Sequence, residues 1–316
     1  MTITGDVSLL DAAKNMKDSP VKGVIMTYAL SSHVLMHMPI ENTDGRKTWK
    51  LINDLAYNSS SAAYRNLGSE FTATKTPVQP IAANVKIAGG RVQLDRVLKE
   101  LSPAEIPIQR RGQIAAQARQ LTIDIFEGGG GSAIYGIDSW ISNEPVFSGQ
   151  SMDMGSVSSC GLITEDGMDE FVSLLNTQPG QSFIYCNNAP ARRIKKLGRG
   201  SGYTGASGSY VYNVNYRPEE FGTFAGMYDN IPIIKMVDGK GTDLLSNAKG
   251  DGECTTVYGV TYGTDNYTGF QKGGMKVHEM SEISVLEAFD NEWLVNAVPQ
   301  SVRCIARMRY VTNGVA

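Results

Sequence analysis

Few side chains in this sequence are spaced for chemistry, and the clearest candidate is a glycine-rich loop. Gly200, Gly202 and Gly205 fit the G-x-G-x-x-G pattern that cradles the phosphates of a dinucleotide. Such a loop needs a strand before it and a helix after it, so that a helix N-terminus meets the pyrophosphate. Here a basic helical stretch precedes the loop and a Ser/Tyr-rich strand pattern follows it. We therefore interpret this stretch as a plain surface loop.

The histidines are a second set of candidate functional residues. His33 and His37 stand four residues apart in HVLMH, which would place both imidazoles on one helix face. No neighbouring Glu, Asp or Cys completes a zinc ligand set, so packing among apolar neighbours is the favoured interpretation. The third histidine, His278, has no motif around it, and neither Gly-x-Ser-x-Gly nor His-Glu-x-x-His occurs. The sequence therefore predicts no catalytic residues, no metal, no cofactor and no enzymatic activity.

The four cysteines, Cys160, Cys186, Cys254 and Cys304, are scattered without a Cys-x-x-Cys pair. In a chain of 316 residues this distribution predicts buried, reduced thiols in preference to a disulfide framework or a zinc site.

A basic cluster is the last candidate for recognition. It consists of Arg192, Arg193, Lys195, Lys196 and Arg199. A nucleic-acid contact is one interpretation, but a solvated helix face with cations near its C-terminus is favoured. The formal net charge of the whole chain is -3, which does not indicate non-specific nucleic-acid binding through a cationic surface.

Targeting signals are not evident. The N-terminus lacks a basic segment followed by an apolar one, and no uninterrupted apolar run approaches the roughly 18 residues of a membrane span. We expect a soluble protein that is made in a cytoplasm and has no membrane partner.

A long helix and four glycines form the most distinctive local pattern. Ile114, Ala118, Leu121 and Ile125 make one apolar stripe, which predicts a helix that starts near Pro103 and ends at 127. The glycines at 128–131 follow at once. They lack the Lys-Ser/Thr of a phosphate loop, so helix termination and a hinge are the favoured interpretation.

Strand patterns surround this helix. Residues 39–80 read as a long hairpin with a loose polar tip, whose apolar content is too small to bury both faces within its own chain. After the glycines, Asp166 is expected to cap a helix, SFIYC reads as a buried strand, and Asn188 with Pro190 opens the basic helix. From 210 onward, strand follows strand with Gly-rich turns. The fold class is α+β, with an antiparallel C-terminal part and no βαβ alternation.

The order of these features resembles the major capsid proteins of tailed double-stranded-DNA bacteriophages, whose fold is shared with encapsulins. VLMHMPIENTDGRKTWKL looks like the entry into the extended E-loop of that family. NVKIAGGRVQLDRVL looks like the return strand with its Leu-Asp-Arg end, and EWLVNAVPQSVRCIARMRYV looks like the terminal stretch. The resemblance covers nearly the whole chain as an ordered pattern.

The resemblance implies a division of the chain. It assigns 1–38 to an N-terminal arm and 39–84 to the E-loop. It assigns 85–130 and about 266–316 to a peripheral domain that includes a spine helix at 103–127, and about 131–265 to an axial domain. The hinge residues are then Gly128, Gly129, Gly130 and Gly131, and candidates for E-loop contacts between subunits are Trp49, Tyr57, Tyr64 and Phe71.

The resemblance also implies a function and partners. We expect a structural subunit that assembles with itself into hexamers and pentamers of an icosahedral shell around a phage genome. A separate scaffolding protein, a portal and non-specific contact with packaged DNA are the other expected partners. Such a subunit is assembled in the host cytoplasm and located in the virion. Lys47, Lys50 and Lys75 lie in the E-loop region, but no motif selects one for a crosslink.

Two alternatives stay open at this point. An encapsulin-type nanocompartment subunit shares the fold and encloses protein instead of DNA. A soluble nucleotide-binding enzyme that uses the loop at 200–205 is the remote alternative. Nucleic acid in the native particle, or nucleotide binding by a small oligomer, would distinguish them.

Overall fold

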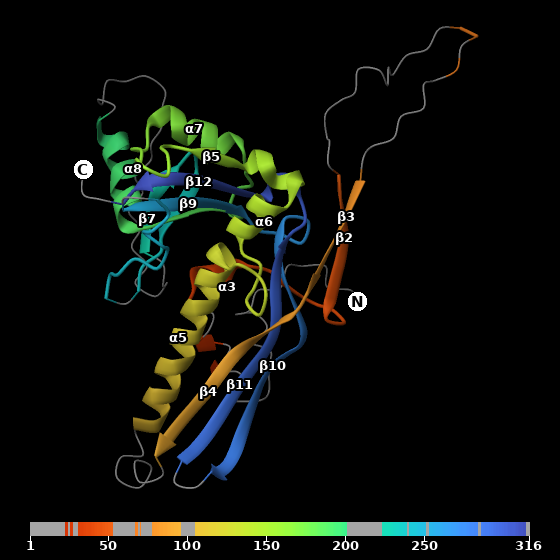
Figure 1. Ribbon diagram of the computed structural model, residues 1–316, viewed down its shortest axis with the longest axis vertical. Helices are drawn as coiled ribbons and strands as arrows, with labels where there is room; N and C mark the ends of the chain where they lie inside the picture. The colour runs from red at the N-terminus through yellow and green to blue at the C-terminus, as the bar shows by residue number, and fades with distance from the viewer. Residues whose placement is uncertain are drawn as a thin grey trace.

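The computed structural model describes residues 23–24, 26–27, 31–52, 67–68, 70, 78–95, 105–200, 223–238, 240–250, 253–283 and 286–313. Figure 1 shows an elongated molecule in which a six-stranded sheet with its helices lies at one end. A long helix and a four-stranded sheet extend away from it, and a two-stranded ribbon stands beside both.

The four-stranded sheet has the order β1-β10-β11-β4. Its strands are β1 (Ile40–Asn42), β4 (Lys86–Asp95), β10 (Tyr267–Ile283) and β11 (Leu286–Pro299). β10 and β11 pair as one long antiparallel hairpin, with a register shift between Gln271 and Met275 where Gly273 and Gly274 have positive φ. β10 is therefore one continuous strand with a bulge at the glycine pair.

Helix α5 (Glu105–Glu127) lies along this sheet and is the expected spine helix. The predicted stripe is confirmed, since Ile114, Ala118, Leu121 and Ile125 are all buried. Its opposite face carries exposed polar residues such as Gln113 and Gln120. We call α5 and the four-stranded sheet the peripheral module.

The six-stranded sheet has the order β5-β12-β9-β6-β8-β7. Its strands are β5 (Ser151–Asp153), β6 (Ser182–Cys186), β7 (Thr223–Tyr228), β8 (Ile231–Lys235), β9 (Cys254–Thr261) and β12 (Ile305–Thr312). The predicted buried strand SFIYC is confirmed as β6, whose five residues are all buried. The sheet is mixed, because β5–β12 and β6–β8 are parallel pairs.

Helices cover both faces of this sheet. Helices α7 (Glu165–Ser173) and α8 (Asn188–Gly200) bury Met168, Phe171 and Ile194 in a cluster with sheet residues. On the other side, the end of α5 and the short elements α6 (Ile137–Asn143), η1 (Pro145–Gln150) and α3 (His33–His37) share a larger core with the peripheral module. We call the six-stranded sheet with α6, η1, α7 and α8 the axial module. The short helix η2 (Val302–Cys304) directly precedes β12.

The ribbon consists of β2 (Arg46–Ile52) and β3 (Val78–Asn84), paired in antiparallel register. It corresponds to the two strands of the expected E-loop hairpin, and most of the tip between them lies outside the described residues.

Strand β12 pairs with β9 and β5 in the six-stranded sheet, whereas the expected division grouped 305–312 with the rest of 266–316. Two sequence expectations are wrong in detail. Helix α7 is capped by Thr164, whose hydroxyl accepts from Gly167 N at 3.1 Å, rather than by Asp166. Cys160 and Cys254 form a disulfide across 94 residues, so only Cys186 and Cys304 are the expected buried thiols.

Candidate functional site

The glycine stretch forms a tight turn between α5 and α6. Gly129 bridges to Tyr135, and Gly136 N donates to Gly128 O at 2.8 Å. Gly130 and Gly131 have φ of +81° and +70°, a conformation that residues with a Cβ seldom adopt. Gly130 and Gly131 are therefore required for the shape of this turn.

The four glycines are not equivalent. Gly128 is buried, and a Cβ there would overlap the carbonyl oxygens of Ile134 and Asp124. Gly129 and Gly131 are exposed, and nothing lies within 4 Å of the Cβ that each would carry. Gly129 and Gly131 therefore face open space, whereas Gly128 is fixed by packing and Gly130 lies against the Tyr135 ring.

An ion-pair network holds the end of α5 to the axial module. The Glu127 carboxylate accepts from Ser246 N at 3.1 and 3.2 Å and lies 3.3 Å from Lys249 Nζ. Lys249 Nζ also lies 2.8 Å from Asp138 Oδ2, and Arg307 Nη1 lies 3.3 Å from Asp138 Oδ1. Segments from α5, α6, the loop before β9, and β12 thus meet at one cluster of charges.

Burial shapes the titration of this network. Burial raises the pKa of Glu127, and the positive charge of Lys249 opposes only part of that rise. Burial lowers the pKa of Lys249, but the charges and hydrogen bonds of Asp138 and Glu127 outweigh it and leave the pKa raised. Lys249 therefore stays charged at neutral pH and compensates two partly buried carboxylates.

Aromatic side chains pack the ribbon against the same junction. Trp49 of β2 packs edge-on against Trp140 of α6 with centroids 6.0 Å apart, and Trp140 packs against Tyr135 of the turn at 4.8 Å. Trp49 is only 8% exposed. Lys86, just beyond the ribbon, donates a hydrogen bond to Gly131 O. The ribbon is therefore linked to the glycine turn through Trp140, while Lys86 of β4 contacts the turn directly.

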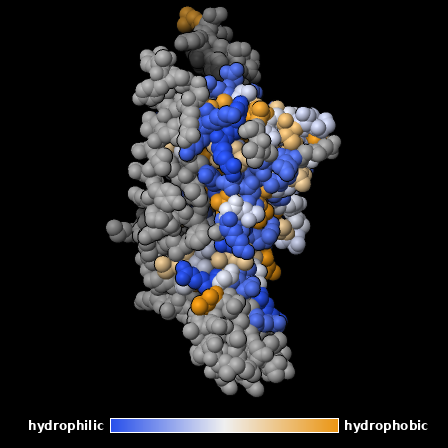
Figure 2. Space-filling view, turned by 90° about the vertical axis from the view of Figure 1, so that its left-hand side faces the viewer, coloured by the Kyte–Doolittle hydropathy of each residue, from blue (hydrophilic) through white to orange (hydrophobic). Residues whose placement is uncertain are grey.

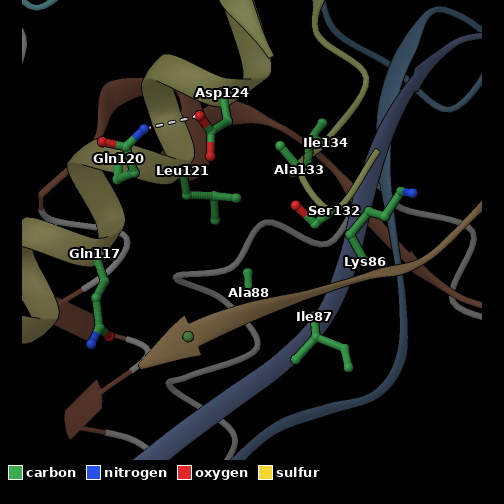
Figure 3. A pocket seen from close by; sticks show the side chains of 11 residues that line it. Lys86, Ile87, Ala88, Gln117, Gln120, Leu121, Asp124, Ser132, Ala133 and Ile134 are labelled. Carbon is green, nitrogen blue, oxygen red and sulfur yellow. Dashed lines mark hydrogen bonds between the residues drawn. The ribbon is translucent and has the colours of Figure 1, made fainter. Parts of the chain in front are cut away.

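A cleft of about 360 Å³ lies between α5, β4 and the turn. Figure 3 shows Leu121 of α5 and Ala88 of β4 pointing toward each other across it, with Ser132, Ala133 and Ile134 of the turn above. Its lining mixes apolar residues with two glutamines and with the polar side chains of Lys86, Asp124 and Ser132, and it contains no histidine or cysteine.

The two expected packing histidines lie at the junction of α3 with the axial sheet. His33 and His37 have ring centroids 4.3 Å apart, and His33 Nδ1 lies 3.1 Å from the Tyr185 hydroxyl. Burial, with a smaller contribution from His37, lowers the pKa of His33 to about 3, so this ring is neutral. Among the described residues, no group of three His, Cys, Asp or Glu side chains could hold a metal ion.

The basic cluster lies on α8. Arg192 and Lys196 are exposed, whereas Ile194 between them is buried, so the helix presents its charges away from the sheet as expected for a solvated face. Arg193 Nε donates to Ile163 O at 3.1 Å. Figure 2 shows the side of the molecule on which α8 lies, and hydrophilic residues gather in its upper part. The loop at 201–205 lies outside the described residues.

Of the four residues expected to contact other subunits, Trp49 packs against Trp140 of its own chain. Its contact with another subunit stays a prediction. Tyr57, Tyr64 and Phe71 lie outside the described residues.

Sequence reasoning missed the junction network altogether. Glu127, Asp138, Lys249 and Arg307 are separated by up to 180 residues, and each looks like an ordinary surface charge in its local context. The one available signal was Glu127, a carboxylate placed directly before a helix-ending glycine run.

No helix in the described part of the chain is both long and apolar enough to cross a bilayer.

Comparisons with known proteins identify the fold. No family model and no curated protein sequence matches the chain. The capsid of a native GTA particle superposes with a TM-score of 0.59 and 13% identity, over 90% of this chain and 91% of that one. The holo-SrpI encapsulin of Synechococcus elongatus gives 0.58 and 13%, over 86% and 85%. A structure of Mycobacterium phage Bobi gives 0.54 and 10%, over 90% and 91%.

These similarities extend over nearly the whole length of each chain, at an identity too low to carry more than the fold. The chain therefore has the α+β fold of tailed-phage major capsid proteins, which encapsulins share. The expected fold class is confirmed.

Proposed function

We propose that this chain is the major capsid protein of a tailed phage, a structural subunit that assembles with itself into pentamers and hexamers of an icosahedral shell. The single observation that supports this most strongly is the agreement of fold over about nine-tenths of the chain with a phage-type capsid. The function is mechanical, in agreement with a site built from packing and ion pairs.

The shape of the subunit supports the same proposal. The ribbon stands beside the body and buries only one face, since Trp49 and Leu51 are buried while Thr48 and Lys50 point outward. Exposed apolar side chains lie on both modules, with Ile108 of α5 68% exposed and Val157 of the axial module 54% exposed. Apolar groups in such positions are suited to contacts with neighbouring subunits. Closed shells are built from heterologous contacts of this kind.

The glycine turn serves as the pivot in this proposal. Subunits in non-equivalent positions of a shell must differ slightly in shape. The turn lies beside a cleft and between two well-packed modules, and Gly129 and Gly131 are its exposed residues. The fixed neighbours Gly128 and Gly136 confine any movement to this short segment.

An encapsulin-type shell is the second candidate, because an encapsulin matches the fold about as well as the GTA capsid does. The contents of the native particle decide between the two. Nuclease-protected DNA in purified particles supports the phage capsid, and a co-purifying protein cargo without nucleic acid supports the compartment.

Negative-stain electron microscopy of the purified chain is the direct test. It is run with and without a candidate scaffolding protein encoded nearby, since a separate scaffold and a portal belong to the proposal. Closed shells, or rings of five and six subunits, are expected in at least one condition. A uniform monomer or dimer in both conditions would contradict the proposal.

A further inference from the structure

The disulfide joins a surface loop to a central strand of the axial module. Cys160 lies in the loop between β5 and α7 and is partly exposed, whereas Cys254 begins β9 and is fully buried. The loop is also tied to β12, because Gly161 N donates to Tyr310 O at 2.8 Å and Thr312 N donates to Gly161 O at 2.9 Å. The loop side of the bond is therefore held in place without it.

The other two cysteines lie in a different environment. Cys186 and Cys304 are unpaired and fully buried, and burial raises the pKa of each thiol to about 12. Neither has a cysteine within disulfide distance, so neither is placed to form a disulfide. Cys160 is thus the one cysteine in this chain that combines a partner with access to solvent.

The strand side of the disulfide leads to the junction. Ala248 forms a bridge with Cys254, and Lys249 N donates to Cys254 O at 3.1 Å. The side chain of the same Lys249 makes the ion pairs with Glu127 and Asp138 at the end of α5. A covalent bond at Cys254 therefore fixes the backbone from which Lys249 reaches the spine helix.

We propose that Cys160–Cys254 is a reversible redox clamp that is open in the reducing cytoplasm and closes after the particle is released, which tightens the junction between the axial module and α5. The change of compartment rests on the proposed function. Disulfides are rare in cytosolic proteins and persist on particles exposed to an oxidising environment, so the bond fits the later stage.

The oxidant that we propose is a low-molecular-weight disulfide such as oxidised glutathione. The exposed Cys160 thiolate attacks one sulfur and expels the first thiolate, which takes up the proton lost by Cys160. The Cys254 sulfur then attacks the Cys160 sulfur of the mixed disulfide and expels the second thiolate, which takes up the proton lost by Cys254. One small disulfide is reduced to two thiols while the two protein thiols are oxidised.

Thiol counting tests the timing. Cells that express the chain are lysed in acid, and the denatured protein is labelled with a maleimide that adds a resolvable mass per thiol. All four cysteines should be labelled at harvest, and two after the folded protein is treated with oxidised glutathione. The Cys160→Ser variant should keep its three labels under both conditions. Two labels in wild type at harvest would contradict a clamp that closes late, and four after oxidation would contradict the pair itself.

Thermal melting and hydrogen exchange test the clamp. Reduction of the oxidised wild type should lower Tm by about 5–10 °C, because a long closed loop is released. The Cys160→Ser/Cys254→Ser double variant, treated in the same way, should not respond. Reduction should also speed exchange of the Lys249 amide at least tenfold, and unchanged exchange would contradict a link to the junction. All these measurements use unassembled subunits. They therefore test the clamp even if the chain does not form shells.

Discussion

At the scale of single residues, the junction depends on contacts that tolerate little change. Gly128 leaves no space for a Cβ beside the Ile134 carbonyl, whereas Gly129, one residue later, faces open space. Glu127 and Asp138 share Lys249 as a common cation. Two predictions follow from these observations, one steric and one electrostatic.

Gly128→Ala should destabilise the folded subunit by about 1–3 kcal/mol, because the new methyl group forces the backbone apart at the end of α5. Gly129→Ala is the matched control and should change the free energy of unfolding by less than about 0.5 kcal/mol. Urea denaturation followed by circular dichroism measures both. Equal effects of the two substitutions would show that the turn is looser than the structure has it.

Lys249→Met should destabilise the subunit by about 1–3 kcal/mol at pH 7, because two partly buried carboxylates lose their compensating charge. Burial already raises the pKa of Glu127, and loss of Lys249 raises it further. The folded variant then binds a proton more tightly than the unfolded chain, so its stability increases as the pH falls through that raised pKa. The loss relative to wild type should therefore shrink between pH 7 and pH 5.

The control for this prediction is Lys240→Met, which removes an exposed lysine from the neighbouring loop. It should leave the stability nearly unchanged across the same pH range. A destabilisation by Lys249→Met that stays constant from pH 7 to pH 5 would point to lost packing of the lysine stem instead of lost charge.

At the scale of secondary-structure elements, the ribbon differs from the other parts of the described fold in how little of it is packed. Only one of its faces is packed, and Trp49 supplies the largest buried side chain of that face. Lys50, the next residue, points outward and is exposed. The ribbon is therefore attached to α6 through a small number of side chains.

Trp49→Ala should destabilise the subunit by about 2–4 kcal/mol, because a large indole ring is removed from its contact with Trp140. Lys50→Ala removes a side chain from the opposite face of the same strand and should cost less than about 0.5 kcal/mol. The comparison is made by thermal melting of unassembled subunits. If Trp49→Ala were as mild as Lys50→Ala, the ribbon would not be seated as described.

These elements also show what local sequence can specify. The stripe of α5 and the five buried residues of β6 were predictable, because helix and strand periodicity are properties of neighbouring residues. Three other features were not predictable from local sequence: the packing of Trp49 on Trp140, the disulfide and the Lys249 network. Each of them joins residues 90 or more positions apart. The partners of strand β12 were not predictable either, since a strand pattern does not reveal which sheet the strand joins.

At the scale of the whole molecule, one core continues from the peripheral module into the axial module. Phe126, the penultimate residue of α5, packs against Tyr185 at 5.1 Å and Tyr258 at 5.0 Å in the axial sheet. Any pivoting at 129–131 therefore has to work against this packing. Small tilts are compatible with it, and large rotations are not.

The pivot is tested by Gly129→Pro combined with Gly130→Pro. Proline fixes φ near −65°, which is incompatible with the positive φ of Gly130 and removes the freedom of the segment. We expect subunits that fold but form few closed shells, or shells of altered diameter, when examined by electron microscopy under conditions in which wild type assembles. Gly129→Ala, which adds a methyl group in open space, should assemble as wild type does. Circular dichroism of the double variant must first show a folded subunit. Normal yield and diameter from such folded subunits would mean that the shell obtains its adaptability elsewhere and that the glycines serve only to shape the turn.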